Sequence, residues 1–466
     1  MSIRKSNLMI SLLISAIGAC AGSVSLAAQT QPYRTSFVWL GPGQPGVLYE
    51  PRALGPKAGI GVFAMHDNGD YLGSNPGNPC APLATRGYRV LCANSTTAKD
   101  GFVSDDDTDK LMLNVKAGVS YLRNLKGIRK VVLFGHSGGG EMMAAYQNIA
   151  ENGARVCQGP EKLIRCPNSL DGMPVPDGIM LIDAVLGAPV TTLISLDPAV
   201  VDEEGGKALN PDLDIYNPKN GFDPKGSTYS DEFKSTFFAK EGERMNALIA
   251  KALDRLAKIE AGTGRYTDDE PFIIPGAFGL QNKLNSEDVS LQAHTRNAWP
   301  LLHADGSVTT EVIRSVRVPR GASSPTPSLA RGTTTTTVRR FLNTFAIRTT
   351  PGYGYDASTI SGIDWKSSYA DEIDSIEGIA KPLLQMGMTG SYEYFWSEIA
   401  RDHAKSVDKT LAYVEGALHS FAPCTQCALA KGLPADHYGD TIKTLYDYVD
   451  KWLSKPGRFI AEGTRR

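Results

Sequence analysis

A serine flanked by glycines, directly behind an apolar segment, constrains the fold of this chain more than any other feature. The segment 131–134 (Val-Val-Leu-Phe) predicts a buried strand, and Gly135-His136-Ser137-Gly138-Gly139 follows it without a spacer. Residues 141–150 are good helix formers and predict a helix. Glycines remove the side chains that would otherwise hold a strand and a helix apart at a tight turn. The sequence therefore predicts a strand, a sharp turn that presents Ser137 on a strained backbone, and a helix.

Strands and helices alternate on both sides of this turn. Strands are predicted at about 60–65, 88–91, 179–183, 381–387 and 410–414, and helices at about 110–125, 397–406 and 440–453. Such alternation is typical of a mostly parallel sheet with helices on both faces. With 466 residues, 42% of them hydrophobic, the chain is long enough for a sizeable core. We therefore expect an α/β fold with a core built from residues 28–201 and 381–466.

Residues 202–380 interrupt this alternation. They include one amphipathic stretch at about 232–261, several prolines and the low-complexity run Thr333–Thr337. We expect this segment to be an inserted cap or lid region, because long insertions in compact domains are often functional. A surface insertion without contact to the site is the alternative.

The N-terminus has the layout of an export signal. Arg4 and Lys5 precede an apolar run over 8–17, and small residues end at Ala27. This pattern predicts a signal peptide over residues 1–27 and a periplasmic or secreted protein. Cys20 lies in a sequence similar to a lipoprotein cleavage site, so a lipid anchor at Cys20 is the alternative. No other stretch is long and apolar enough to span a membrane.

The cysteine count agrees with export. Six cysteines remain after the signal peptide, an even number that favours three disulfides in an oxidising compartment. Neighbouring cysteines give the simplest pairing, although the sequence leaves the connectivity open. The pairs would be Cys80 with Cys92, Cys157 with Cys166, and Cys424 with Cys427. A redox or zinc role for the last pair is not favoured, since no second CxxC motif supplies further ligands.

Charge and motifs exclude several classes of partner. A net charge of -2 gives no basic surface for nucleic acid. The glycines around Ser137 lack the GxGxxG spacing of a dinucleotide site, and no histidine pair has the spacing of a metal site such as HExxH. We therefore expect no cofactor and no metal, and a small molecule as the partner.

Together these features resemble the α/β-hydrolase fold superfamily, in particular serine esterases and lipases, over residues 35–200 and 380–455. The resemblance rests on the strand ending at His66, the Leu-Ala-x-Arg-Gly-Tyr-x-Val run at 83–90, the Ser137 turn, the proline-led strand ending at Gly387, and the loop with His419. It implies that Ser137 is a nucleophile and that His419, after a late strand, takes its proton.

The third member of the implied triad is less well defined. Members of the superfamily often have an Asp about three residues after the proline-led strand, where this chain has Gly390. Glu393 is the nearest carboxylate downstream and is our candidate to orient the imidazole of His419. Glu398, Asp183 and Asp197 are the alternatives.

The resemblance also implies an oxyanion hole, a pair of backbone N–H groups that stabilise the negative oxygen of a reaction intermediate. The Gly138 N–H is the first expected donor. The loop after His66 should supply the second, from Asp67 or Asn68. Superfamily members commonly have His-Gly where this chain has His66-Asp67.

Such a constellation predicts a serine hydrolase that cleaves a carboxylic ester through an acyl-enzyme intermediate. An amide, peptide or lactone hydrolase is the alternative within catalysis, because the triad does not select the leaving group. A noncatalytic binding protein that keeps the fold is the alternative of another class.

Overall fold

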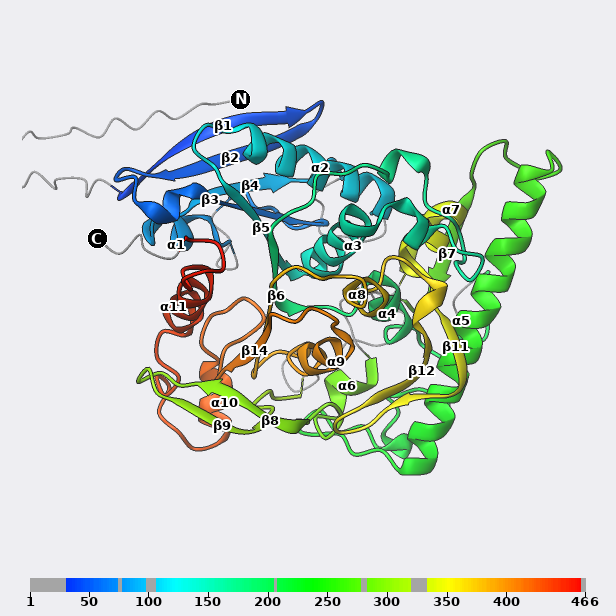
Figure 1. Ribbon diagram of the computed structural model, residues 1–466. Helices are drawn as coiled ribbons and strands as arrows, with labels where there is room; N and C mark the ends of the chain where they lie inside the picture. The colour runs from blue at the N-terminus through cyan, green and yellow to red at the C-terminus, as the bar shows by residue number, and fades with distance from the viewer. Residues whose placement is uncertain are drawn as a thin grey trace, which may run out of the picture. The chain divides into compact units, whose positions relative to one another are not determined.

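A ten-stranded sheet forms the centre of the molecule (Figure 1). The structure is a computed structural model that describes residues 31–73, 78–97, 106–204, 208–277, 283–319 and 333–461. The predicted signal peptide and Cys20 lie outside these residues. In spatial order the strands are β1 (Tyr33–Gly41), β2 (Gln44–Pro51), β4 (Arg89–Asn94), β3 (Ile60–His66), β5 (Lys130–Ser137), β6 (Gly178–Ala184), β13 (Leu383–Met388), β14 (Lys409–Val414), β8 (His294–Leu302) and β9 (Val308–Arg314).

The sheet is parallel from β4 to β8 and antiparallel at its two ends. Alternate side chains of each strand serve opposite faces, as the pleat of a strand requires. On β3, for example, Phe63 and Met65 enter one core cluster, and Val62 and Ala64 enter the other.

Helices cover both faces of the sheet. Helices α2 (Thr108–Asn124), α3 (Gly138–Asn152) and α9 (Trp396–His403) pack into one cluster, and α1 (Cys80–Thr85) and α11 (Thr441–Leu453) pack into the other. This is the two-faced, mostly parallel architecture that the sequence predicts. The chain has the α/β-hydrolase fold. The helices and strands predicted outside residues 202–380 are all present, with ends that differ by a few residues.

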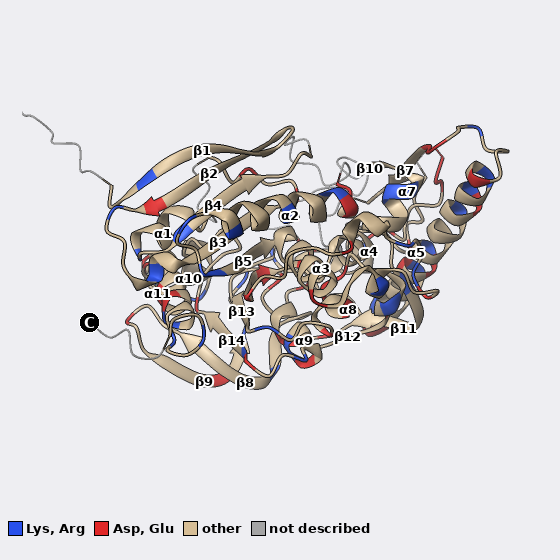
Figure 2. Cartoon of the chain, turned by 45° about the horizontal axis from the view of Figure 1, so that its top comes forward, with Lys and Arg blue, Asp and Glu red and all other residues tan. Residues whose placement is uncertain are grey.

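Residues 202–380 both extend the sheet and build structure beside it. Strand β8 pairs with β14 and β9 pairs with β8, so part of this segment belongs to the main sheet. The predicted amphipathic helix is α5 (Asp231–Glu260), which lies along β11 (Arg348–Tyr355) (Figure 1). Figure 2 shows charges of both signs along α5, as expected for a helix with one solvated face. The role of the segment as a cap or lid stays a prediction.

Shorter elements complete the described chain. They are α4 (Ala188–Leu193), β7 (Pro271–Pro275), α6 (Lys283–Glu287), β10 (Thr333–Thr337), α7 (Val338–Arg340), β12 (Ile360–Asp364), α8 (Glu372–Ile376) and α10 (Thr425–Ala430). None of the helices in the described ranges combines the length and apolar character that a membrane crossing needs.

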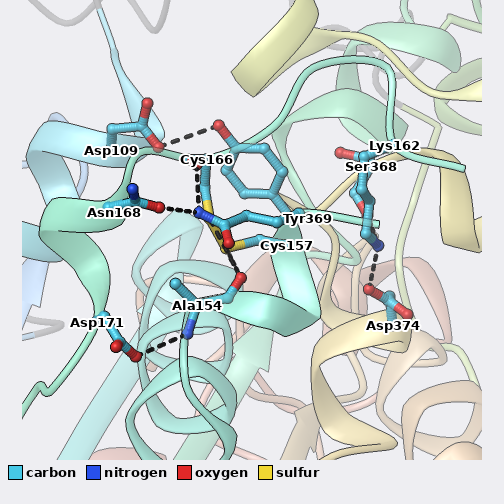
Figure 3. Close-up of a disulfide and its surroundings, with 11 residues drawn as sticks. Asp109, Ala154, Cys157, Lys162, Cys166, Asn168, Asp171, Ser368, Tyr369 and Asp374 are labelled. Carbon is cyan, nitrogen blue, oxygen red and sulfur yellow. Dashed lines mark hydrogen bonds and ion pairs between the residues drawn. A yellow bond between two sulfur atoms is a disulfide. The ribbon is translucent and has the colours of Figure 1, made fainter. Parts of the chain in front are cut away.

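Three disulfides join the neighbouring cysteines, so the local pairing is confirmed. The Cys157–Cys166 bridge closes the loop after α3 (Figure 3). In that loop the buried Lys162 ammonium contacts the Asp374 carboxylate of α8 and donates to the Ser368 carbonyl over 2.7 Å. The bridge therefore fixes a loop that connects the helix behind Ser137 to α8.

Candidate active site

Ser137 lies at a strained turn between β5 and α3. Its backbone angles are φ 56° and ψ -133°, a region that non-glycine residues rarely occupy. A side chain at Gly135 would come within 2.6 Å of the Gly139 carbonyl oxygen, and one at Gly139 within 2.6 Å of the Met65 carbonyl oxygen. The glycines are therefore needed for close approach, and they let α3 begin directly behind the serine.

His419 lies in the loop between β14 and α10, and Asp183 holds its ring. The Nδ1 atom of His419 is 2.6 Å from Oδ2 of Asp183, at the end of β6. Asp183 is fully buried, and its Oδ1 accepts a hydrogen bond from the Met388 N–H over 2.9 Å. Burial raises the pKa of the Asp183 carboxyl, and the contact with His419 opposes this rise. A carboxylate at Nδ1 keeps the proton on that nitrogen and leaves Nε2 to act as a base.

Glu393, our candidate from the sequence, lies at the same imidazole but farther away. Its Oε2 is 3.6 Å from Nδ1 of His419 and accepts a hydrogen bond from Ser391 Oγ over 2.7 Å. Because β6 and β13 are adjacent and parallel, the residues that follow them meet at one edge of the sheet. Two carboxylates thus converge on one nitrogen, and Asp183 makes the closer contact.

The other two candidate acids serve different parts of the structure. The Glu398 carboxylate is fully buried and accepts hydrogen bonds from the β8 backbone and from the Trp299 indole. Asp197 Oδ1 accepts a hydrogen bond from the Ala199 N–H, within its own loop. Neither contact involves His419.

His136, the residue before the nucleophile, contacts the His419 loop. Its Nε2 is 2.8 Å from the His419 carbonyl oxygen, and its Nδ1 is 3.3 Å from the Tyr71 hydroxyl. Burial, together with His419 and His66, lowers the pKa of His136 well below its usual value, and burial raises the pKa of Tyr71. Both groups are therefore neutral, so the Tyr71 hydroxyl donates to Nδ1 and the Nε2–H donates to the His419 carbonyl.

The expected oxyanion donors lie on facing segments. Gly138 begins α3, and a side chain there would collide with the Asp67 carboxylate. Asp67 also pairs with His66 Nδ1, and its Oδ1 accepts a hydrogen bond from the Asn68 N–H over 2.8 Å. The loop after β3 is therefore next to Gly138, with the Asp67 side chain between them. The oxyanion donors stay a prediction.

A pocket opens beside Ser137 and Gly138. Its walls come from the loop after β3, the first turn of α3 and the segment 185–192, and none of the described residues of 202–380 lines it. Glu141, one turn along α3, lines this pocket and an adjoining cavity.

Within the described residues, one group of three side chains brings possible metal ligands together, and it is Asp183, Glu393 and His419. Their ligand atoms lie within 4.8 Å of one another. The Nδ1 atom of His419 is already bonded to Asp183, which fits a proton-transfer arrangement.

Comparison with known proteins gives weak likeness only. No family model matches the chain, and no curated protein matches it in sequence. Among solved structures, the siderophore hydrolase EstB from Aspergillus fumigatus is 12% identical, with a TM-score of 0.42 over 92% of this chain and 100% of that one. Est1E from Butyrivibrio proteoclasticus is 11% identical, with a TM-score of 0.36 over 90% and 97%. A thioesterase domain from the curacin biosynthetic pathway is 12% identical, with a TM-score of 0.33 over 90% and 99%. The fold assignment rests on the sheet topology.

The sequence does not single out four residues of the site: Asp183, Tyr71, His136 and Glu141. Asp183 was one of several alternatives, although its place as the single carboxylate at the end of the apolar strand 179–182 is a signal that favours it. The roles of Tyr71 and His136 depend on neighbours far away in the sequence. Glu141 belongs to no sequence motif that indicates a functional role.

Proposed function

We propose that the protein is an exported serine hydrolase that cleaves carboxylic esters through an acyl-enzyme. The observation that carries the proposal is a serine on a strained strand-to-helix turn, at the same sheet edge as a histidine whose Nδ1 is bonded to a buried carboxylate. We assign Ser137 as nucleophile, His419 as general base and acid, and Asp183 as the group that orients His419. Glu393 is a secondary carboxylate at the same nitrogen.

In the proposed reaction, His419 Nε2 takes the proton of the Ser137 hydroxyl as Oγ attacks the ester carbonyl carbon. The carbonyl oxygen becomes an oxyanion, stabilised by the Gly138 N–H and by a second N–H from Asp67 or Asn68. The Asn68 N–H would have to exchange its bond to Asp67 Oδ1 for the oxyanion. The intermediate collapses, His419 returns the proton to the leaving alkoxide, and Ser137 carries the acyl group. A water molecule, deprotonated by His419, then releases the acid and restores the serine.

Ser137→Ala tests this proposal. We expect wild-type protein to hydrolyse 4-nitrophenyl esters and to be labelled at Ser137 by a fluorophosphonate, which reacts with activated serines. The variant should lose both properties. Full esterase activity in the variant would contradict the assignment of Ser137 as the nucleophile. Wild-type protein that neither reacts with the probe nor cleaves any ester would instead support a noncatalytic binding protein, and cleavage of aminoacyl anilides in preference to esters would support an amide or peptide hydrolase.

The predicted signal peptide supports export, and the three disulfides are compatible with an oxidising compartment. N-terminal sequencing of the protein recovered from the periplasm or medium tests this part. A first residue near 28 is expected, and a lipidated Cys20 would contradict it.

A further inference from the structure

The first turn of α3 brings a buried carboxylic acid to the pocket beside Ser137. Glu141 is only 6% exposed and lines that pocket. Its Oε1 accepts a hydrogen bond from the Ala188 N–H over 3.1 Å, whereas its Oε2 is shielded from solvent and has no partner among the described residues. Burial, with Asp67 nearby, raises the pKa of Glu141 well above its usual value. A buried carboxyl group with an unpartnered oxygen is costly. The protonated acid can donate from Oε2 and the ionised form can accept there, so a polar ligand group at this atom would be favourable.

A second pocket residue has an unpartnered oxygen. Thr191, on α4, lines the same pocket, and its Oγ1 is buried without a partner in the described part of the chain. The neighbouring Thr192 also lines the pocket, but its Oγ1 already donates to the Ala188 carbonyl over 2.8 Å. Glu141 on α3 and Thr191 on α4 thus each bring a buried oxygen without a partner among the described residues to the wall of the pocket.

The charges around the pocket favour the same kind of ligand. Asp67 and Glu141 line the pocket, and the adjoining cavity adds Asp106. No lysine or arginine of the described residues lines either space. Such a lining disfavours anions, and a cationic ligand beside Glu141 would shift this acid toward its ionised form.

The position of Glu141 on α3 sets the reach of the ligand. Glu141 is four residues after Ser137, and each helical residue advances about 1.5 Å, so the two backbone positions lie roughly 6 Å apart along the helix axis. An acyl group bound to Ser137 would span this distance with two or three carbons between its carbonyl and a terminal donor.

We propose that this pocket selects short acyl groups that end in a hydrogen-bond donor, an ammonium or a hydroxyl, which Glu141 and Thr191 recognise. This inference rests on the proposed esterase function and names its substrate class.

The test compares three 4-nitrophenyl esters of equal acyl length: butyrate, 3-hydroxypropionate and β-alaninate. Each kcat/KM is divided by the rate of spontaneous hydrolysis of that ester, which removes intrinsic differences in reactivity. We expect at least one donor-bearing ester to exceed butyrate by about tenfold or more, and the better of the two identifies the donor as ammonium or hydroxyl.

Variants then assign the preference to the two side chains. Glu141→Gln keeps an oxygen for the Ala188 N–H but replaces Oε2 by an NH₂ donor, so the ratio of donor ester to butyrate should fall toward one. Thr191→Val should lower the ratio, and the matched control Thr192→Val should keep it. Fluorophosphonate labelling of Ser137 confirms that each variant is folded.

Two results would overturn the inference. If labelled wild-type protein prefers butyrate or treats the three esters alike, the substrate class is wrong while the esterase proposal stands. If Glu141→Gln and Thr191→Val both keep the wild-type ratio, the recognition is wrong. Absence of labelling and of all ester hydrolysis would instead remove the proposed function and, with it, the inference.

Discussion

At the scale of single residues, the choice between two carboxylates decides how His419 works. Asp183 is fully buried and lies 2.6 Å from Nδ1, whereas the Glu393 side chain is partly exposed and lies 3.6 Å away. A short contact with a buried carboxylate fixes the tautomer of the imidazole and stabilises its protonated form. Asp183 meets both conditions more closely.

We therefore predict that Asp183→Asn lowers kcat for 4-nitrophenyl acetate by about 10²–10⁴-fold. The asparagine keeps the acceptor for the Met388 N–H but presents an NH₂ group to Nδ1, which favours the wrong tautomer. The comparison variant Glu393→Gln should lose less than about tenfold, since its oxygen lies beyond hydrogen-bond distance. Steady-state kinetics of both variants checks this assignment, and a larger loss in Glu393→Gln would reverse it.

The sequence locates the nucleophile well and the acid poorly, for a physical reason. The strand, the glycines and the helix around Ser137 are contiguous in the sequence. The five residues 135–139 are therefore enough to predict the turn. The acid is a property of sheet order, because Asp183 and Glu393 approach one imidazole only when β6 and β13 are neighbours. Because position 390 is a glycine, the sequence favours the next carboxylate downstream, Glu393. The local sequence does not indicate which of the two strand ends lies closer to His419.

At the scale of elements, the loop that carries His419 is held by β5. The His136 Nε2–H donates to the His419 carbonyl, and the two rings lie with their centroids 4.7 Å apart. This bond adds to the contact with Asp183 in fixing the position of His419. A displacement of about 1 Å at a catalytic group can lower the reaction rate strongly. We therefore regard His136 as a positioning residue.

The prediction is that His136→Leu lowers kcat by tenfold or more with little change in KM, because the leucine cannot donate to the His419 carbonyl. His136→Gln retains an N–H donor near the place of Nε2 and should recover part of the loss. The rate of fluorophosphonate labelling should follow kcat in the same order. Equal loss in both variants, or a change confined to thermal stability, would assign His136 a packing role only.

The sheet has more strands than the sequence predicts. Strands β8 and β9 lie within the segment 202–380, which the sequence does not divide into clear elements. β8 contains Pro300 and several polar residues, and most side chains of β9 are exposed. Strands near a sheet edge need few apolar residues at alternate positions. Hydrophobic periodicity therefore does not predict them.

At the scale of the whole molecule, buried acids couple stability to pH. Burial, assisted by Asp371, raises the pKa of Glu372 to about 8, and burial raises the pKa of Asp371 and Glu141 as well. Between the ordinary value of 4.5 and about 8, folded Glu372 keeps a proton that the unfolded chain has lost. Stability therefore declines as pH rises through this window.

Glu372→Gln removes that proton linkage, so the variant should gain stability relative to the wild type as pH rises from 5 to 8. One group contributes at most about 1.4 kcal/mol per pH unit, and the difference in unfolding free energy should level off above pH 8. Asp408→Asn is the matched control: hydrogen bonds from Arg458 lower the pKa of Asp408, so its titration is complete below pH 5 and its difference from wild type should stay constant. Urea unfolding at pH 5, 6, 7 and 8 measures both differences. If the Glu372→Gln difference were as flat as that of the control, Glu372 would be ionised in the folded protein at neutral pH, and its burial would have to be compensated by a donor within the α8 region.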